Sequence, residues 1–518
     1  MKKYIAMMLA LVMALSLFAG CGGSGEETAA PAAPAAPEAP AAAPEGKKEL
    51  VLGIDSDIDD LNPMSNQMNN FVALFIFNVY EPLFHLNADM EYEMDLATAV
   101  AQPDELTYEI TLREGVSFHN GQAFTAADVI NTIEYIQDEQ NAAWRAPQYA
   151  AVESMTADGD YKLTIKLSVA TPAFLDNLAY TPIFCKDDDP AALSSAVNGT
   201  GAFRFVSWAP NDKFEFEKFA DYWDADAVSV EKLIVRPYPD YTVAITNMEA
   251  GSVDILNRVT VDNALTIESK SGLKLVSAKS SNSMDLFEIG RHNCAPLADP
   301  KVMEAMLLAF DLESVNAAVY QGKGEIMTSC YPAGAKYHKD VLANEYDLEK
   351  ARAALAESAY PDGFEFTCKI LKGYDAGEMA AVIWQASLQQ IGITMNVVNE
   401  EMSVWLENYL GRSYDMIWNT YSMVGSDPAT FNSIILEQLY PHQLADLPAL
   451  QLLIDEGKVT VDEAKRAEIY GEIQDIVGEY LPAYPYISIP IICGTQDYVD
   501  GLQVNGMGHL VLKNISLG

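Results

Sequence analysis

The chain has 518 residues, half of them hydrophobic, and its 74 acidic against 32 basic side chains give a formal net charge of −42. This length accommodates two or three domains with large hydrophobic cores. The acidic excess repels phosphate backbones, which argues against nucleic acid as a partner, and it is typical of a soluble protein in an exposed location.

Residues 1–20 have the pattern of a secretory signal peptide. Two lysines precede an apolar run over residues 4–18, and this run is too short for a comfortable membrane span. The segment ends at Cys21, and LFAGC resembles a bacterial lipobox, in which the cysteine receives a lipid and becomes the first residue of the mature protein. Phe18 stands where leucine is commoner. The alternative is an ordinary cleaved signal peptide in which Cys21 has no role.

The next segment is rich in alanine, proline and glutamate, and reads GGSGEETAAPAAPAAPEAPAAAPEG over residues 22–46. It lacks the large apolar side chains that would offset the entropy lost on ordering, and its prolines favour extended conformations. Placed after a lipidated Cys21, residues 21–47 are predicted to be a disordered tether that holds the folded body off the membrane.

The first elements of the folded body alternate between strand and helix. Residues 49–54 are a short apolar run typical of a strand. Residues 106–112 and 161–167 alternate apolar and polar side chains, which predicts strands buried on one face. The stretch between these two strands has one helical face, formed by Val129, Ile133 and Ile136.

The C-terminal half continues the pattern, with helices predicted over residues 347–358, 376–392 and 461–480 and a strand over 393–398. Asp347 is expected to cap the first helix. The second is expected to end at Gly392 in the left-handed conformation, with an apolar face formed by Met379, Ile383 and Ala386. Because strands and helices interleave along the whole body, the fold class is α/β or mixed α+β.

Residues 114–128, EGVSFHNGQAFTAAD, bring a histidine, an amide and a carboxylate together, as in some acid–base sites. Asn120-Gly121 is, however, a strong tight-turn signal. Thr125, followed three residues later by Asp128, has the pattern of a helix-capping box. We therefore predict that this loop separates a strand from a helix and that His119 is structural.

Motifs for catalysis or cofactor binding are missing from the sequence: it contains no GxSxG, HExxH, P-loop or GxGxxG. GTGAF, residues 199–203, is glycine-rich but does not open a helix, so it is predicted to be a turn with Gly199 or Gly201 at positive φ. The six histidines are isolated, and the five cysteines after Cys21 have no CxxC spacing. We therefore predict that the protein forms no metal site of its own and binds no cofactor. Disulfides are possible, but the sequence does not show which cysteines would pair.

Several stretches, taken together in chain order, resemble the extracytoplasmic solute-binding proteins of peptide and nickel ABC importers, also called bacterial extracellular solute-binding family 5. Each stretch alone is modest, but their order behind a lipoprotein signal is specific. They span nearly the whole mature body and include residues 61–136, 198–223, 247–256, 296–315, 346–366 and 388–398.

The resemblance implies a two-lobed, periplasmic-binding-protein-like fold with an extra domain inserted into the first lobe. Ligand would lie between the lobes and be buried by hinge closure. The chain would cross between lobes near residues 267–280 and 482–491. The implied parts are the signal peptide (1–20), Cys21 with its tether (21–47), the first lobe (48–84, 198–270 and 485–518), the inserted domain (85–197) and the second lobe (271–484).

Residues 404–431 contain the candidate ligand-binding residues. Aromatic side chains gather there, and Trp405, Trp418 and Tyr421 are predicted to line the cleft, although each is equally typical of a core. In peptide-binding relatives an aspartate in the loop before Asp-Pro holds the peptide amino terminus, and Val424 stands at its place here. Either Asp427 takes over this role or the ligand presents no free amine in the usual way, since a buried ammonium needs a carboxylate. The alternative for Asp427 is a turn residue before proline.

The function implied by the resemblance is that of a substrate-binding lipoprotein of an ABC importer, with di- or oligopeptides as the default ligand and no catalysis. Its partners would be the permease and ATPase subunits, and it would act as a monomer outside the cytoplasm, anchored through Cys21. Two alternatives share the fold: a peptide receptor or chaperone for signalling, and a binding protein for a metal chelate or glycan. An extracellular hydrolase is disfavoured because no motif supports one.

Overall fold

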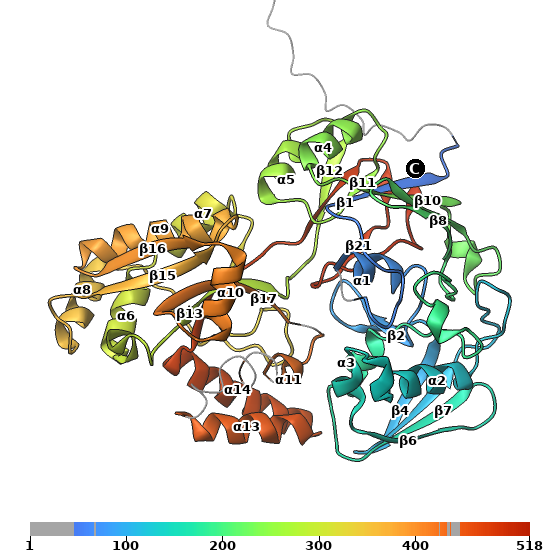
Figure 1. Ribbon diagram of the computed structural model, residues 1–518, viewed down its shortest axis with the longest axis horizontal. Coiled ribbons are helices and arrows are strands. Elements are labelled where there is room, and N and C mark those ends of the chain that lie inside the picture. The colour runs from blue at the N-terminus through green and yellow to red at the C-terminus, as the bar shows by residue number, and fades with distance from the viewer. Residues whose placement is uncertain (1–45, 67–68, 424, 433–435, 437–445) are drawn as a thin grey trace, which may run out of the picture. The chain divides into compact units, whose positions relative to one another are not determined.

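The computed structural model describes residues 46–518 except 67–68, 424, 433–435 and 437–445 (Figure 1). The predicted signal peptide, Cys21 and most of the predicted tether lie outside the described residues, as does Val424. Within the described part of the chain, no helix is long and apolar enough to cross a membrane.

The first lobe is built on a seven-stranded sheet with β1 near its centre. β1 pairs in parallel with β10 and β11, and the sheet continues with antiparallel pairs on both sides. Leu50 and Leu52 of β1 pack into a large core on one face, and Val51 packs against α4 and α5 on the other. In sheet order the strands are β12 (Leu273–Ser277), β19 (Ile492–Gln496), β11 (Ile255–Leu256), β1 (Glu49–Ile54), β10 (Lys232–Pro237), β9 (Lys213–Lys218) and β8 (Phe203–Ala209). The helices are α1 (Asn69–Phe75), α4 (Tyr241–Glu249) and α5 (Val261–Glu268).

A four-stranded antiparallel sheet, together with α2 and α3, forms the region where the inserted domain is expected. Its two inner strands bury alternate side chains, and Val129, Ile133 and Ile136 of α2 are buried as predicted. The predicted strands 106–112 and 161–167 are thus confirmed. The elements here are β2 (Phe84–Leu86), β3 (Tyr92–Met94), β4 (Ala97–Asp104), β5 (Thr107–Leu112), α2 (Ala126–Gln137), β6 (Val152–Ala157), β7 (Lys162–Leu167) and α3 (Phe174–Ala179).

The second lobe is built on a six-stranded sheet. One face is covered by α6 to α9, and the other by α10 and by α11, α13 and α14. In sheet order the strands are β14 (Glu325–Ile326), β18 (Ala483–Ser488), β13 (Ser283–Ile289), β17 (Met416–Ser422), β15 (Glu365–Leu371) and β16 (Thr394–Glu400). The helices are α6 (Pro300–Leu308), α7 (Leu312–Val319), α8 (Leu348–Glu357), α9 (Asp375–Gln390), α10 (Met402–Leu410), α11 (Pro428–Phe431), α13 (Pro448–Val459) and α14 (Glu463–Tyr480).

Short elements complete the described chain. Two hairpin-like pairs lie near its end: β20 (Val499–Asp500) with β23 (Ser516–Leu517), and β21 (Gln503–Val504) with β22 (Leu510–Val511). The 3-10 helices lie at Glu139–Asn141, Ala146–Tyr149, Pro190–Ala192, Ala225–Ala227 and Ala295–Ala298.

Two of the expected lobe boundaries were placed too early. Residue 271 was expected to begin the second lobe, but β12 is hydrogen-bonded to β19 in the first sheet. Residue 485 was expected to return to the first lobe, but β18 pairs with β13 in the second sheet. The chain therefore passes between the sheets over residues 278–282 and 489–491. The reason is strand pairing, which a single sequence does not reveal.

The sequence predicted the ends of the helices more accurately than the faces that they bury. Asp347 caps α8 by accepting from the amides of Glu349 and Lys350, and Gly392 has φ +94° after α9, both as predicted. The predicted apolar face of α9 was wrong: Met379 is exposed, and the buried face is formed by Ala380, Ala381, Trp384 and Leu388. The indole of Trp384 sets this face by stacking on Phe310 at 4.3 Å between ring centroids.

The glycines of GTGAF serve a purpose other than the one predicted. Neither Gly199 nor Gly201 has positive φ. A Cβ on Gly199 would lie 1.9 Å from the carbonyl oxygen of Val79, and one on Gly201 would lie 2.5 Å from that of Asn78. Both residues are glycine because two backbone segments touch there.

The histidine loop is structural in geometry, as predicted. Gly121 has φ +86°, and the Asp128 carboxylate accepts from the Thr125 amide at 2.8 Å, which is one half of the capping box. His119 is buried, and its Nε2 lies 2.9 Å from the carbonyl oxygen of Gly201. Burial lowers the pKa of His119 to about 4, so the ring is neutral at physiological pH.

Candidate ligand-binding site

A cavity of about 250 Å³ lies where elements of the two lobes meet. The second lobe contributes the beginning of β13 and the end of β17, directly beside the crossing segment 278–282. The lining side chains belong to Val72, Trp144, Arg145, Gln148, Asp176, Asn177, Tyr180, Arg258, Ser283, Ser422, Met423, Met507 and His509. Most of them come from the first lobe and the inserted domain, so the chemistry of the cavity is set mainly on that side.

Arg145 is a buried cation in this lining, with 1 % of its surface exposed. Its Nη atoms donate to the carbonyl oxygens of Pro63 at 3.2 Å and Tyr180 at 3.3 Å, and its guanidinium lies 4.1 Å from the ring centroid of Trp144. Its Nε has no hydrogen-bond partner within the described part of the chain. Burial lowers the pKa of Arg145 to about 10, which still leaves it charged.

Arg258 is the second cation of the lining and has an unusual backbone, with φ +50°. Its guanidinium donates to the carbonyl oxygen of Met507 and lies against Gly508, where a Cβ would come within 2.6 Å of Nη2. Its Nε also lacks a partner among the described residues. The strained backbone of a non-glycine residue at positive φ indicates that the Arg258 side chain is held in place for a purpose.

His509 lies beside the two arginines without adding charge. Burial lowers the pKa of His509 to about 3, and Arg258 contributes to the shift. Its ring lies 4.7 Å from that of Phe77 and 5.5 Å from that of Tyr180, measured between centroids. The imidazole is therefore neutral and packed.

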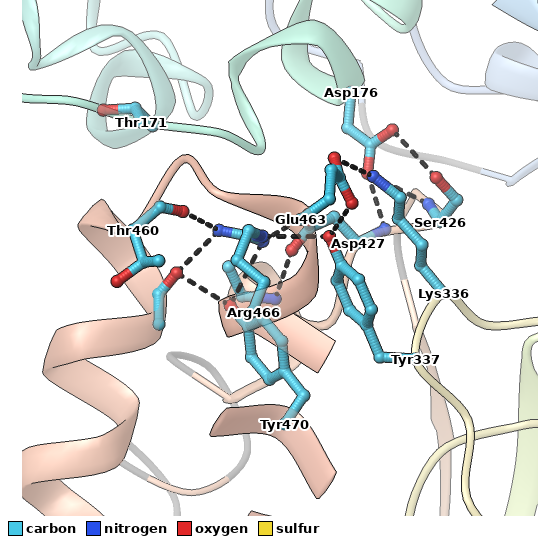
Figure 2. A network of polar contacts seen from close by, with 12 residues as sticks. Thr171, Asp176, Lys336, Tyr337, Ser426, Asp427, Thr460, Glu463, Arg466 and Tyr470 are labelled. Atoms are coloured by element: carbon cyan, nitrogen blue, oxygen red, sulfur yellow. Dashed lines mark hydrogen bonds and ion pairs between the residues drawn. The ribbon is translucent and has the colours of Figure 1, made fainter. Parts of the chain in front are cut away.

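Asp176 on α3 is the carboxylate of the lining, and it is already occupied. It accepts from the amides of Ser426 at 3.0 Å and Asp427 at 2.8 Å (Figure 2). It also accepts from the Tyr92 hydroxyl at 2.5 Å. The inserted domain thus binds the loop after β17 through backbone donors. Burial raises the pKa of Asp176, and these hydrogen bonds counteract that rise.

Asp427 has two structural roles in that same loop. Its Oδ1 accepts from the Ala429 amide at 3.0 Å and so caps α11, and its Oδ2 lies 2.5 Å from Nη2 of Arg466 on α14 (Figure 2). Both side chains are buried. The Arg466 guanidinium also donates to the carbonyl oxygens of Gly457 at 2.7 Å and Thr460 at 3.1 Å. The carboxylate of Asp427 is therefore engaged within the second lobe.

The three predicted aromatic residues do not lie together. Trp418 and Tyr421 are three residues apart on β17 and therefore point to opposite faces of the sheet. Trp418 packs with α9, where a Cβ on Gly377 would lie 2.5 Å from the indole, and its Nε1 donates to the Tyr486 hydroxyl at 3.0 Å. Trp405 stacks on Tyr409 within α10.

Tyr421 points toward α10 and a buried carboxylate. Its hydroxyl donates to Glu288 at 2.5 Å and lies 2.5 Å from the hydroxyl of Tyr409. Glu288 also accepts from Tyr414 at 2.9 Å and Asn419 at 3.1 Å, and burial raises its pKa. The aromatic stretch thus mainly completes the two faces of the second sheet. Among the described residues of this segment, Ser422 and Met423 line the cavity, so ligand contact by Trp405, Trp418, Tyr421 or Asp427 stays a prediction.

Sequence reasoning missed Arg145, Arg258 and Asp176. They lie far apart along the chain, and none belongs to a motif with its own chemistry. The one local signal was the pair Trp144-Arg145, because an aromatic ring beside an arginine permits the stacking that the structure shows.

Cysteine and metal chemistry leave no further site in the described residues. Cys185, Cys294, Cys330, Cys368 and Cys493 are free and buried. No group of three or more histidine, cysteine, aspartate or glutamate side chains in the part of the chain that the structure describes could hold a metal ion.

Comparison with known proteins decides the family. The model of the bacterial extracellular solute-binding proteins, family 5, matches residues 91–438, which is more than half of the chain. The chain belongs to this family. Its members are solute-binding proteins rather than enzymes.

Individual relatives extend the match over most of the chain. The glutathione-binding protein GsiB of Pectobacterium atrosepticum is 27 % identical over 68 % of this chain and 69 % of its own length. The oligopeptide-binding protein AppA of Bacillus subtilis is 25 % identical over 94 % of both chains. The crystal structure of the ABC transporter substrate-binding protein CtaP of Listeria monocytogenes has a TM-score of 0.81 at 22 % identity, covering 90 % of this chain and 99 % of its own. At that identity the structural match shows the two-lobed fold alone.

Proposed function

We propose that this protein is the ligand-binding component of an ABC importer for short peptides or closely related small solutes. The observation that carries the proposal is the cavity lined by Ser283 and Ser422 from one lobe and by Arg145, Tyr180 and Arg258 from the other. Closure over a ligand at such a place couples binding to a change in lobe arrangement, which a permease can recognise. The relatives named for glutathione and oligopeptides support peptides as the ligand class.

The volume of the cavity favours a small ligand. Its 250 Å³ lies at or below the low end of pockets for drug-sized ligands. A di- or tripeptide is nearer to this size than a long oligopeptide. The Ser283 and Ser422 hydroxyls, 2.7 Å apart, offer polar contacts at the second-lobe side.

We further propose that the mature protein is a lipid-anchored monomer outside the cytoplasm, tethered through Cys21 by residues 22–47. The signal-like segment, the lipobox-like LFAGC and the proline-rich sequence support this proposal. Metabolic labelling with a fatty acid should mark the wild-type protein and leave Cys21→Ala unlabelled, and the variant should be released into the medium. Equal labelling of both would contradict anchoring at Cys21.

The ligand is tested directly on the purified protein. Denaturing it and analysing the released small molecules by mass spectrometry should identify a peptide-like compound, which should raise the melting temperature in a dose-dependent way when added back. If no di- or tripeptide in a defined pool shifts the melting temperature, the peptide assignment is wrong. Cleavage of pool members would instead indicate a hydrolase.

A further inference from the structure

The charge of the cavity lining differs in sign from that of the whole chain. The chain carries a net charge of −42, yet the lining contains two arginines against one carboxylate. Neither Arg145 nor Arg258 has an ion-pair partner among the described residues. Asp176, the carboxylate, is saturated by two amides and a tyrosine hydroxyl. Among the described residues the lining therefore has an excess of positive charge, which Asp55 offsets in part near Arg258, and it has no free carboxylate for an ammonium group.

In both arginines, the Nε–H group is a donor that remains unused. Each has an Nε without a partner in the part of the chain that the structure describes, whereas backbone carbonyls accept from both Nη atoms of Arg145 and from Nη2 of Arg258. A buried guanidinium bonded only to carbonyls remains costly until an anion approaches it. Guanidinium binds both carboxylates and phosphates with good geometry and charge-assisted hydrogen bonds, and of these two groups the peptide-like ligands of the proposed function carry the carboxylate.

We propose that Arg145 and Arg258 hold the carboxylate of the bound solute, so that the protein selects its ligand by an acid group and not by a peptide amino terminus. The proposal deepens the proposed function and depends on it only in taking this cavity as the ligand site. Both arginines belong to the first-lobe side, so ligand would bind there before the second lobe contributes Ser283 and Ser422. This assignment gives a physical reason why the described residues of the lining offer no free carboxylate to an ammonium group.

The selectivity is tested with a pool of dipeptides and tripeptides prepared in four matched forms: free, N-acetylated, C-terminally amidated, and both. Ligands captured by the purified protein are identified by mass spectrometry. A second arm measures melting-temperature shifts with glutarate and citrate against glutaramide. Capture of free and N-acetylated forms, with loss of the amidated forms, is the expected result.

The outcomes separate the two proposals. If peptides bind with equal affinity after amidation, or bind only with a free amine, the carboxylate inference is wrong and the peptide function stands. If glutarate or citrate binds and no peptide does, the peptide function is wrong and the inference stands. If nothing in either arm binds, both are wrong.

Variants then test the two arginines. Arg258→Gln should weaken carboxylate binding by about ten- to hundredfold, as expected for a lost charge-assisted hydrogen bond, and Arg258→Lys should recover part of the affinity. Arg145→Gln should also weaken carboxylate binding. The melting temperature of the ligand-free variant shows whether the substitution destabilises the fold, which distinguishes that effect from a loss of affinity. Arg291→Gln is the matched control, because Arg291 is also buried with an unpartnered Nε but lies outside the cavity. Unchanged affinity in both Arg145→Gln and Arg258→Gln would overturn the proposal.

Discussion

The buried pair of Asp427 and Arg466 permits a sharp test of whether Asp427 is structural or binds ligand. Asp427→Asn keeps an oxygen that can cap α11, because asparagine caps helices as well as aspartate does. It removes the negative charge 2.5 Å from the Arg466 guanidinium, which has none of its surface exposed. The substitution therefore isolates the ion pair from the helix cap.

The expected cost is about 3 kcal/mol of unfolding free energy. Breaking a buried ion pair by removing one partner costs about 3–5 kcal/mol, because the other charge stays buried. The lower end applies here, since Arg466 keeps its bonds to the carbonyl oxygens of Gly457 and Thr460. Arg466→Met in the same chain should recover part of the loss, as the stranded charge disappears with it.

Urea denaturation followed by circular dichroism measures these differences, with the melting temperature as a second readout. Asp462→Asn is the matched control, because Asp462 is an exposed cap of α14 that accepts from the Lys465 amide at 2.8 Å. It should change stability by less than about 0.5 kcal/mol. If Asp427→Asn is as stable as the parent but loses ligand affinity tenfold or more, Asp427 faces the ligand and the structural interpretation is wrong.

Three other substitutions test the fold and the pH dependence. Burial raises the pKa of Asp285 to about 7, so the native state retains a proton that the unfolded chain releases near pH 4. The free energy of unfolding should therefore fall as the pH rises between these two values. Urea denaturation curves measured at pH 5 and pH 8 should differ less for Asp285→Asn than for the parent. Gly201→Ala should lower the melting temperature, at a cost of about 1–3 kcal/mol, because the new methyl group meets the carbonyl oxygen of Asn78 at 2.5 Å; an unchanged melting temperature would contradict the close approach. Trp418→Ala should cost about 3–5 kcal/mol by denaturation, because the indole packs against α9, and ligand affinity of the folded variant measures whether Trp418 also contacts ligand: a loss of affinity would support that contact and unchanged affinity would contradict it.

Local structure was predictable wherever neighbours in sequence decide it. The Asp347 cap, the positive φ of Gly121 and Gly392, and the buried face of α2 depend on contacts within a few residues. α9 shows the limit of this reasoning. A stripe starting at Met379 and another starting at Ala380 both satisfy helical periodicity, and the choice depends on which one meets Phe310 from a distant helix end.

The candidate site was less predictable, because its composition depends on which face of a strand each side chain occupies and on which distant segments pair. Trp418 and Tyr421 lie on opposite faces of the second sheet, because an odd separation on a strand reverses the side. The residues that line the cavity extend from Val72 to His509, and no local pattern links them. Val424, which led to the expectation of a missing amine partner, lies outside the described part of the chain, so that expectation stays a prediction.

The acidic surface and the cationic cavity act on a ligand over different distances. Surface charges act through water and are screened beyond about 10 Å at 0.1 M salt, so the net charge of −42 opposes the approach of an anion only weakly in a salty medium. Within the cavity, Arg145 is desolvated and its interactions are much less screened. A ligand carboxylate that reaches it replaces a costly unpaired charge by a paired one. The affinity for the ligand then depends on this replacement of an unpaired charge by an ion pair. It also depends on the Ser426 and Asp427 amides that hold Asp176 in place, because a freed Asp176 carboxylate would compete with the ligand for the same guanidinium groups.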